Sequence, residues 1–538
     1  MVQRRTLKLK EYGYNAFVAK KVSDKLAPLF EQSSYALRIN ASGGIDNGND
    51  IHSDERICIL SDSFGECSLM DEKDRFVSVC ERHLNSNGYS IELLNFSMTG
   101  MNIFHAIFLL LAKILPLGMS KIIYFTSNSD YQTSRLEDGD FFTYDRDYSI
   151  FNETTKKIDR RGTPSFATYN KLMNVMYAIC RDAKIDLIFA LRPFDDDKRA
   201  KINNITKNFC VKKNIPYMDL QGFSGKDCYY DGTHLTKEGS QQFGLFFYHN
   251  LTGILSHSSS SNKSFSVDTP YNFIPDHFPP RVLKLQEYPA MARIVKETSG
   301  TADESYWGDS RFVLDTDENA FSDNGNNIRT ENKIFVIGDS YIECLFMNPH
   351  ERLLSVAERE LRDVYSCEQE LVNCSKGGSH ILHCIFMFLA KVASMKPSTV
   401  LYAPSINDYK ALCTFGNFYT NHKGLSIFKS SVTDYDRAKP LYSVYRLFVN
   451  IFYNVCRAFG HNLVFMLHPF YGEGSMDKLN ETVIDFCNKK KLLFIDLRNF
   501  PEEEVKKMHY DRAQLLPYGA EIMGKLLAKE LYDKGLIE

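Results

Sequence analysis

The sequence predicts two tandem α/β domains, each with a mainly parallel central sheet covered by helices on both faces. Two observations lead to this fold class. A repeat with a spacing of about 278 residues runs through nearly the whole chain, and domain-sized repeats of this kind indicate a duplication. Within each copy, short apolar runs alternate with helical patterns, which is typical of a parallel sheet.

The repeat consists of motifs that recur in the same order. Residues 7–12 return as residues 283–288, and residues 230–244 align without gaps on residues 510–524. Each copy is about 255 residues long, within the range of one domain. We therefore predict domains at residues 1–255 and 281–538. Residues 256–280 are rich in Ser and Pro, cannot bury enough surface to fold alone, and are expected to be a linker.

Strands in the first copy are expected where apolar or β-branched runs are short, and helices where apolar residues recur at helical spacing. The expected strands are Ile57–Leu60, Ser90–Phe96, Lys121–Thr126, Asp186–Leu191 and Ile215–Asp219. The expected helices are Glu72–Leu84, Ile103–Leu115, Tyr169–Ala183, Asp197–Lys212 and Lys237–Leu251. The second copy follows the same order, with a strand expected at Leu463–Leu467 and a helix at Tyr445–Ala458.

Composition limits the partners. The net charge is −3 with 24% charged residues, which gives no basic field for nucleic acid. The longest apolar stretch, Ile103–Leu115, is too short to span a bilayer, and the N-terminal charges have no signal-peptide core behind them. Thirteen cysteines without a Cys-x-x-Cys pair fit free thiols in a reducing cytoplasm. The histidines lack metal-ligand spacing, so no metal is expected. Nothing indicates an oligomeric state.

Three residues of the first copy have the types needed for nucleophilic catalysis. Ser63 directly follows an expected strand, and Asp231 and His234 share one loop before the last helix. A serine needs a base to become nucleophilic, and that histidine needs a carboxylate to orient it. Sites in parallel sheets lie at the carboxyl ends of the strands, so these residues are expected to meet in one crevice.

Four blocks of the chain resemble the SGNH (GDSL-type) hydrolase superfamily, and the resemblance covers both copies almost end to end. The blocks are residues 61–63, 95–100, 127–130 and 231–234, and again residues 338–340, 373–378, 405–408 and 511–514. This resemblance implies a three-layer α/β/α fold and the hydrolysis or transfer of acyl groups, often acetyl esters on carbohydrates. The segment before each nucleophile strand is similar to members associated with polysaccharide or natural-product biosynthesis.

The first copy departs from that family at the oxyanion hole. The family glycine is Ser97, whose backbone N–H is retained, and the family asparagine is Ser129, with Asn128 one position earlier. Loss of one side-chain donor to an oxyanion typically costs ~10²–10³ in turnover. Ser63, Ser97, Ser129 and Asn128 are the expected oxyanion donors, and the first copy is expected to be a retuned or impaired catalyst.

The second copy departs from the family at a different position. Ser340, Asn407 and Asp511 match the family and Ser375 aligns with Ser97, but Gln514 replaces the histidine. An amide has no usable basicity, so this copy is expected to be degenerate as a serine hydrolase. A glutamine can still hydrogen-bond a ligand, which leaves a binding role open.

Other candidates have plainer interpretations. Arg192 ends an expected strand and is a candidate substrate contact, whereas His105 and His383 are expected to be core histidines bonded to backbone carbonyls. Glu66 is expected to serve the first helical turn. Residues 132–168 form a long connection that is either a lid or a surface excursion.

Two functions from different classes follow. The first is a cytoplasmic serine esterase or acyltransferase whose N-terminal domain acts on a small-molecule or carbohydrate ester and whose C-terminal domain supports it or binds substrate. Hydrolysis needs no cofactor, whereas transfer needs acyl-CoA or another acyl donor. The second is a catalytically inactive ligand-binding or scaffold protein of a glycan or natural-product biosynthetic complex.

Overall fold

The structure is a computed structural model of the chain and forms two compact units. The N-terminal unit is Leu7–Val282, and the C-terminal unit is Leu283–Glu538 together with Met1–Thr6. Except for Ser256 and Pro280, the predicted linker at 256–280 lies outside the described residues. The structure describes residues 5–136, 141–159, 162–225, 227–256, 280–299, 310–326, 328–430, 433, 438–471, 477–511 and 514–537.

The N-terminal unit contains a five-stranded parallel sheet in the order β5-β4-β6-β7-β8. Strands β5 and β6 lie on opposite sides of β4, which places a topological switch point at the carboxyl end of β4. The strands are β4 (Arg56–Leu60), β5 (Glu92–Asn95), β6 (Lys121–Phe125), β7 (Asp186–Leu191) and β8 (Tyr217–Asp219).

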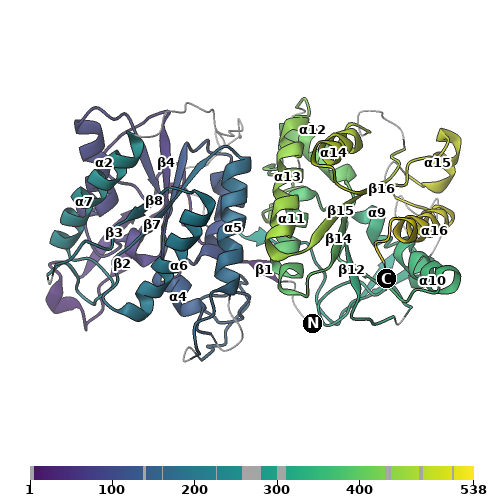
Figure 1. Ribbon diagram of the computed structural model, residues 1–538, viewed down its shortest axis with the longest axis horizontal. Coiled ribbons are helices and arrows are strands. Elements are labelled where there is room, and N and C mark those ends of the chain that lie inside the picture. Colours follow the sequence, from purple (N-terminus) through teal and green to yellow (C-terminus); the bar gives the residue numbers. More distant parts are fainter. Residues whose placement is uncertain are drawn as a thin grey trace. The chain divides into compact units, whose positions relative to one another are not determined.

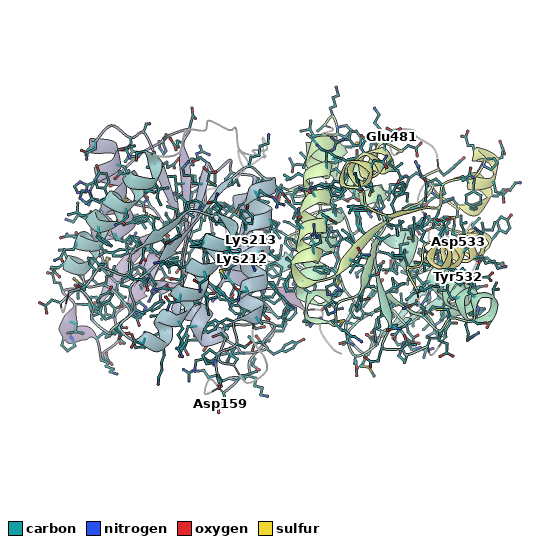
Figure 2. All side chains as sticks on the ribbon, in the orientation of Figure 1. Asp159, Lys212, Lys213, Glu481, Tyr532 and Asp533 are labelled. Carbon is teal, nitrogen blue, oxygen red and sulfur yellow. The ribbon has the colours of Figure 1, made fainter. Side chains whose placement is uncertain are left out.

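Helices cover both faces of this sheet (Figure 1). α2 (Phe76–Ser86) and α7 (Lys237–Leu255) pack against each other and bury Phe76, Phe243 and Phe247 against β4. The other layer consists of α3 (Ile103–Leu109), α5 (Ala167–Asp182) and α6 (Asp197–Lys213). Lys212 and Lys213, labelled in Figure 2, lie in the last turn of α6, where cations interact favourably with the helix dipole.

Short helices follow the carboxyl ends of β4 and β6 and carry residues of the site. α1 (Ser63–Glu66) follows β4, and α4 (Asn128–Thr133) follows β6 with Ser127 as its N-cap. An antiparallel hairpin of β2 (Phe17–Lys21) and β3 (Ser34–Arg38) precedes the sheet. The sequence did not predict this hairpin, because β2 is mostly solvent-facing and has no run of buried β-branched residues.

The C-terminal unit repeats this architecture with the sheet order β13-β12-β14-β15-β16, also all parallel. Its strands are β12 (Lys333–Ile337), β13 (Glu370–Asn373), β14 (Thr399–Tyr402), β15 (Asn462–Leu467) and β16 (Phe494–Asp496), preceded by the hairpin β10 (Arg293–Glu297) and β11 (Arg311–Asp315). Its helices are α9 (Ser340–Glu343), α10 (Leu353–Tyr365), α11 (Ile381–Ala390), α12 (Ile406–Phe415), α13 (Tyr442–Phe459), α14 (Asp477–Lys490), α15 (Glu502–Met508) and α16 (Pro517–Asp533). The two tandem α/β domains predicted from the sequence are confirmed.

Each unit buries the same charged cluster beside the start of its repeat. Glu11 lies 3.1 Å from Lys113 Nζ and 3.0 Å from Arg281 Nη2. Burial by itself would raise the pKa of Glu11, but the two cations outweigh it and lower this pKa to about 2. The corresponding residues of the C-terminal unit are Glu287, Lys391 and Arg5.

The predicted elements of the first copy agree with the structure to within a few residues. The largest difference is the predicted helix Ile103–Leu115, which is α-helical only to Leu109 and continues as a π-helical turn at Leu110–Ile114. All thirteen cysteines are free. Among the described residues, no helix is long and apolar enough to cross a membrane.

Candidate active site

Ser63 lies at the switch point of the N-terminal sheet. It is the first residue of α1, directly after the end of β4, and Asp62 is the N-cap whose side chain accepts a hydrogen bond from Phe64 N. The loop at 231–234 precedes α7, and Thr236 caps that helix. The fold therefore brings the carboxyl end of β4 and the start of α7 to the same edge of the sheet.

Ser63, His234 and Asp231 form a continuous hydrogen-bonded chain. His234 Nε2 lies 2.7 Å from Ser63 Oγ, and His234 Nδ1 lies 2.7 Å from Asp231 Oδ2. An ionised carboxylate can only accept, so Nδ1 carries the proton and Nε2 accepts from the serine hydroxyl. This arrangement orients the histidine as a base for Ser63.

Asp231 is held in its ionised form. Partial burial would raise the pKa of its carboxyl, but hydrogen bonds from the His234 side chain and from the backbone N–H groups of His234 and Thr233 outweigh burial, and the pKa lies below its usual value. The exposed fractions of the two side chains are 28% for His234 and 38% for Asp231. The pair is therefore open to solvent and substrate.

Neighbouring residues hold the loop that carries Asp231 and His234 in place. Arg199 Nη1 donates to Thr233 Oγ1 at 2.8 Å, and the same guanidinium pairs with Asp195 and Asp196. Gly232 has a φ of +73°, a conformation that other residues rarely adopt. Tyr230 stacks on the His234 ring with the centroids 5.6 Å apart and the planes at 15°. These contacts restrict the imidazole to one position.

A pocket of about 530 Å³ opens beside Ser63 and His234. Its wall combines apolar side chains from the segment after α1 with residues of strand β2. The lining residues are Ala19, Lys20, Lys21, Ser63, Phe64, Cys67, Ser68, Leu69, Met70, Thr99, Tyr230, His234 and Leu235. No described residue between 132 and 168 lines it, which favours the surface excursion over the lid for that segment.

Lys20 and Glu66 join the pocket wall to α1. Lys20 Nζ lies 2.7 Å from Glu66 Oε1 and donates to Tyr12 Oη at 2.7 Å, and Thr99 Oγ1 donates to Glu66 at 2.6 Å. Burial would raise the pKa of Glu66, but Lys20 and Thr99 lower it overall. Lys20 was not among the residues predicted from the sequence. The signal in the sequence for this cluster was the recurrence of Tyr12 and Glu66 as Tyr288 and Glu343. In the C-terminal unit, Tyr288 Oη donates to Glu343.

The predicted oxyanion donors have different surroundings. Ser97 N–H donates to Asn95 Oδ1 at 3.0 Å, so this predicted donor is already engaged inside the protein. Asn128 Oδ1 lies 3.5 Å from Gln132 Nε2, along its own helix. The Ser63 N–H, at the first position of α1, has no acceptor among the described residues, as is usual for the first turn of a helix.

Ser129 and Arg192 both contact the residue before the nucleophile. Ser129 N–H donates to Asp62 Oδ2 at 3.3 Å, and Arg192 Nη1 donates to Asp62 Oδ1 at 3.0 Å. The side chains of Arg192 and Asp62 are 1% and 2% exposed. The sequence made Arg192 a candidate substrate contact; the structure instead encloses its guanidinium between Phe64, Phe194 and Asp62.

The equivalent site of the C-terminal unit lacks the base. Ser340 begins α9, and Asp511 Oδ1 accepts from Gln514 N at 2.7 Å, as Asp231 does from His234. The Gln514 amide oxygen, however, is engaged by Tyr510 Oη. Ser375 N–H donates to Asn373, and Asn407 Nδ2 donates to Asp339 at 3.0 Å.

His509 does not replace the missing base. Its Nδ1 lies 2.7 Å from Val505 O, and burial, the largest cause, lowers its pKa. His105 and His383 are buried in α3 and α11, with Nε2 2.9 Å from Ser149 O and 3.3 Å from Ser426 O, respectively. These are the core positions expected from the sequence. The described residues contain no cluster of three or more His, Cys, Asp or Glu suited to a metal ion.

Comparison with known proteins gives structural neighbours only. No protein-family model matches the chain, and no curated protein does. A solved G-D-S-L family protein from Desulfitobacterium hafniense is 13% identical, with 36% of this chain and 98% of that chain covered and a TM-score of 0.28. An acetylxylan esterase from Geobacillus stearothermophilus is 18% identical (38% and 95% covered, TM-score 0.30), and a lipase/acylhydrolase from Enterococcus faecalis is 15% identical (37% and 96%, 0.28). These proteins are of the class that the motifs resemble, but such low scores carry no argument about this site.

Proposed function

We propose that the N-terminal unit is a serine-dependent O-acyl esterase or O-acyltransferase. One observation carries the proposal: Ser63, His234 and Asp231 are joined by two hydrogen bonds of 2.7 Å, and Ser63 and His234 line an open pocket. Serine, histidine and carboxylate in this order are the groups that acyl transfer requires.

The reaction proceeds in two halves. Ser63 Oγ attacks the ester carbonyl carbon while its proton passes to His234 Nε2, and the bond to the leaving alkoxide then breaks as the same proton is returned to that oxygen. In the second half, water or an acceptor hydroxyl gives its proton to His234 and attacks the acyl-serine. The bond between the acyl carbon and Ser63 Oγ then breaks as His234 returns that proton to Oγ. Asp231 accepts from Nδ1 throughout and stabilises the imidazolium.

The oxyanion needs donors aimed at the carbonyl oxygen. Among the described residues, the Ser63 N–H has no acceptor within the protein, which supports its role as one donor. The Ser129 hydroxyl, on the first turn of α4, is the nearest replacement for the family asparagine by sequence position. One side-chain donor fewer predicts a slower enzyme, because each such donor contributes ~10²–10³ to turnover.

The pocket supports a small acyl group next to a polar alcohol. Phe64, Leu69 and Met70 offer apolar contacts for an acetyl chain, whereas Lys21, Thr99 and Tyr230 offer polar groups for a carbohydrate or related metabolite. An ester of this kind fits hydrolysis without a cofactor. Transfer to a sugar hydroxyl needs acyl-CoA or another donor. The thirteen free thiols support a reducing compartment such as the cytoplasm.

The C-terminal unit has a supporting or substrate-binding role in this proposal. Among the described residues, neither Gln514 nor His509 is placed as a base for Ser340, since Gln514 is bonded to Tyr510 and His509 is buried on a backbone carbonyl. The alternative is that both units are binding or scaffold modules. The engaged Ser97 N–H favours that alternative, because it removes one expected oxyanion donor.

Turnover of p-nitrophenyl acetate by the wild type, Ser63→Ala and Ser340→Ala separates these functions. We expect activity that Ser63→Ala abolishes and Ser340→Ala leaves intact, with a fluorophosphonate probe labelling the Ser63 peptide. Absence of both turnover and labelling would overturn the enzymatic proposal in favour of the binding module. Activity lost with Ser340→Ala would overturn the assignment of the two units. Acetyl-CoA with candidate glycans then tests transfer.

A further inference from the structure

The residue before each nucleophile is a buried aspartate whose carboxylate ties neighbouring strand ends together. In the N-terminal unit, Asp62 accepts from Phe64 N, Ser129 N and Arg192 Nη1. Phe64 lies after β4, Ser129 after β6 and Arg192 directly after β7. The carboxylate therefore fixes the backbone of the nucleophile turn to the ends of three strands.

The C-terminal unit satisfies the same carboxylate with neutral donors. Asp339 accepts from Tyr341 N at 3.0 Å, from Asn407 Nδ2 at 3.0 Å and from the Ser405 hydroxyl. Its burial raises the pKa of this carboxyl to about 6. Burial outweighs the opposing hydrogen bonds from Ser405 and Tyr341 and the positive charge of Lys410, and it favours the protonated form of this carboxyl.

His468 stands where the N-terminal unit has Arg192, directly after the fourth strand of the sheet. It does not reach Asp339. Its Nε2 lies 2.7 Å from Pro404 O, and its ring stacks on Tyr341 with the centroids 3.8 Å apart. The N-terminal unit therefore has Arg192 and Ser129 where the C-terminal unit has His468 and Asn407. The charged donor to the carboxylate is found in the unit that lacks the asparagine.

We infer that Arg192 is a positioning residue that replaces the missing asparagine side chain on Asp62 and so holds Ser63 in line with His234. This inference rests on the proposed acyl chemistry at Ser63 and goes beyond it, because it assigns Arg192 to the nucleophile turn and not to the substrate. A fully buried guanidinium bonded to a buried carboxylate cannot contact a ligand in the pocket, whereas it can set the position of the adjacent peptide.

The residues that differ between the two units define the variants for the test. Arg192→His gives the N-terminal unit the residue of the C-terminal unit, and Arg192→His with Ser129→Asn restores the complete neutral set. Misplacement of a reacting group by about 1 Å can cost ~10²-fold. We therefore expect Arg192→His to lower kcat about 10²-fold with little change in KM, and Ser129→Asn to raise kcat at least about tenfold more in the Arg192→His background than in the wild type.

Several readouts separate the outcomes. The rate of fluorophosphonate labelling of Ser63 is expected to fall and recover in parallel with kcat, and Arg192→Lys, which keeps the charge, is expected to lie between. A wild-type kcat in Arg192→His, or a raised KM with unchanged kcat, would overturn the inference. If Arg192→His does not fold, a double variant that folds and turns over supports it, and one that folds without activity overturns it. An inactive, unlabelled wild type refutes the proposed function instead.

Discussion

Replacement of Asp231 by Asn is expected to reverse the hydrogen bonding of His234 while leaving the loop in place. Asp231 Oδ1 accepts from the backbone N–H groups of Thr233 and His234 at 3.0 and 2.8 Å. An asparagine oxygen would keep that position, because its amide nitrogen cannot accept from an N–H group. The amide NH₂ would then occupy the place of Oδ2 and donate to His234 Nδ1.

The consequence is the wrong tautomer for catalysis. With Nδ1 accepting, the proton of neutral His234 lies on Nε2, which faces Ser63 and can no longer take the serine proton. A tautomer change of this kind in a serine triad costs about 10⁴ in kcat. This factor corresponds to about 5.4 kcal/mol of transition-state stabilisation, at about 1.36 kcal/mol per tenfold.

Steady-state turnover of p-nitrophenyl acetate measures this loss. KM is expected to change little, because the acyl pocket is untouched, and fluorophosphonate labelling of Ser63 is expected to slow with kcat. Asp511→Asn is the matched control, since Asp511 accepts from Gln514 N in the same turn but is followed three positions later by glutamine instead of histidine. A kcat above a tenth of the wild-type value in Asp231→Asn would refute the triad reasoning.

Three further predictions concern the framework of the site. Glu66→Gln removes the carboxylate that holds Lys20 and is expected to cost about 2 kcal/mol of stability, as loss of a charged hydrogen bond does, measured as a lower urea midpoint of the N-terminal unit; an unchanged midpoint would contradict the role of this pair. Gly65→Ala would place a Cβ in steric overlap with Ser97 Oγ and is expected to lower both the thermal midpoint and kcat; wild-type values for both would argue against close packing here. Burial raises the pKa of Asp130 to about 7, so the folded state keeps a proton that the unfolded chain has lost. The wild type should therefore lose stability relative to Asp130→Asn as pH rises from 5 to 7, with no further change above 7; a constant difference in urea unfolding would contradict this.

The sequence predicted the sheets well because the central strands are short apolar runs that are buried on both faces. The five strands of the first copy lie within two residues of their predicted bounds, and the triad follows from the position of each loop at the carboxyl edge. The hairpin of β2 and β3 was not predictable in this way, because its stability comes from contacts distant in the chain, such as that of Lys20 with Glu66.

The orientation of individual donors was the other part that the sequence could not provide. Ser97 occupies the expected block, yet its N–H points to Asn95, a residue two positions away that competes for the same donor. Arg192 ends a strand where a side chain can face the crevice, yet it turns inward to Asp62. In both cases a buried polar partner decides the direction, because an unsatisfied buried group costs more than a solvent-facing one.

The two copies show which constraints the fold imposes and which the chemistry imposes. Glu11 with Lys113 and Glu287 with Lys391 are buried ion pairs of 3.1 Å at equivalent positions, and removal of one partner of such a pair typically costs about 3–5 kcal/mol. Both units therefore keep them whether or not they catalyse. Glutamine in place of histidine at position 514 carries no such structural cost, because Gln514 lies in a half-buried loop and is bonded to Tyr510 of the same turn. A unit of this fold can thus carry glutamine where the other unit has histidine and retain its fold. Under the proposed function, a gain of turnover on Gln514→His would depend on freeing that side chain from Tyr510.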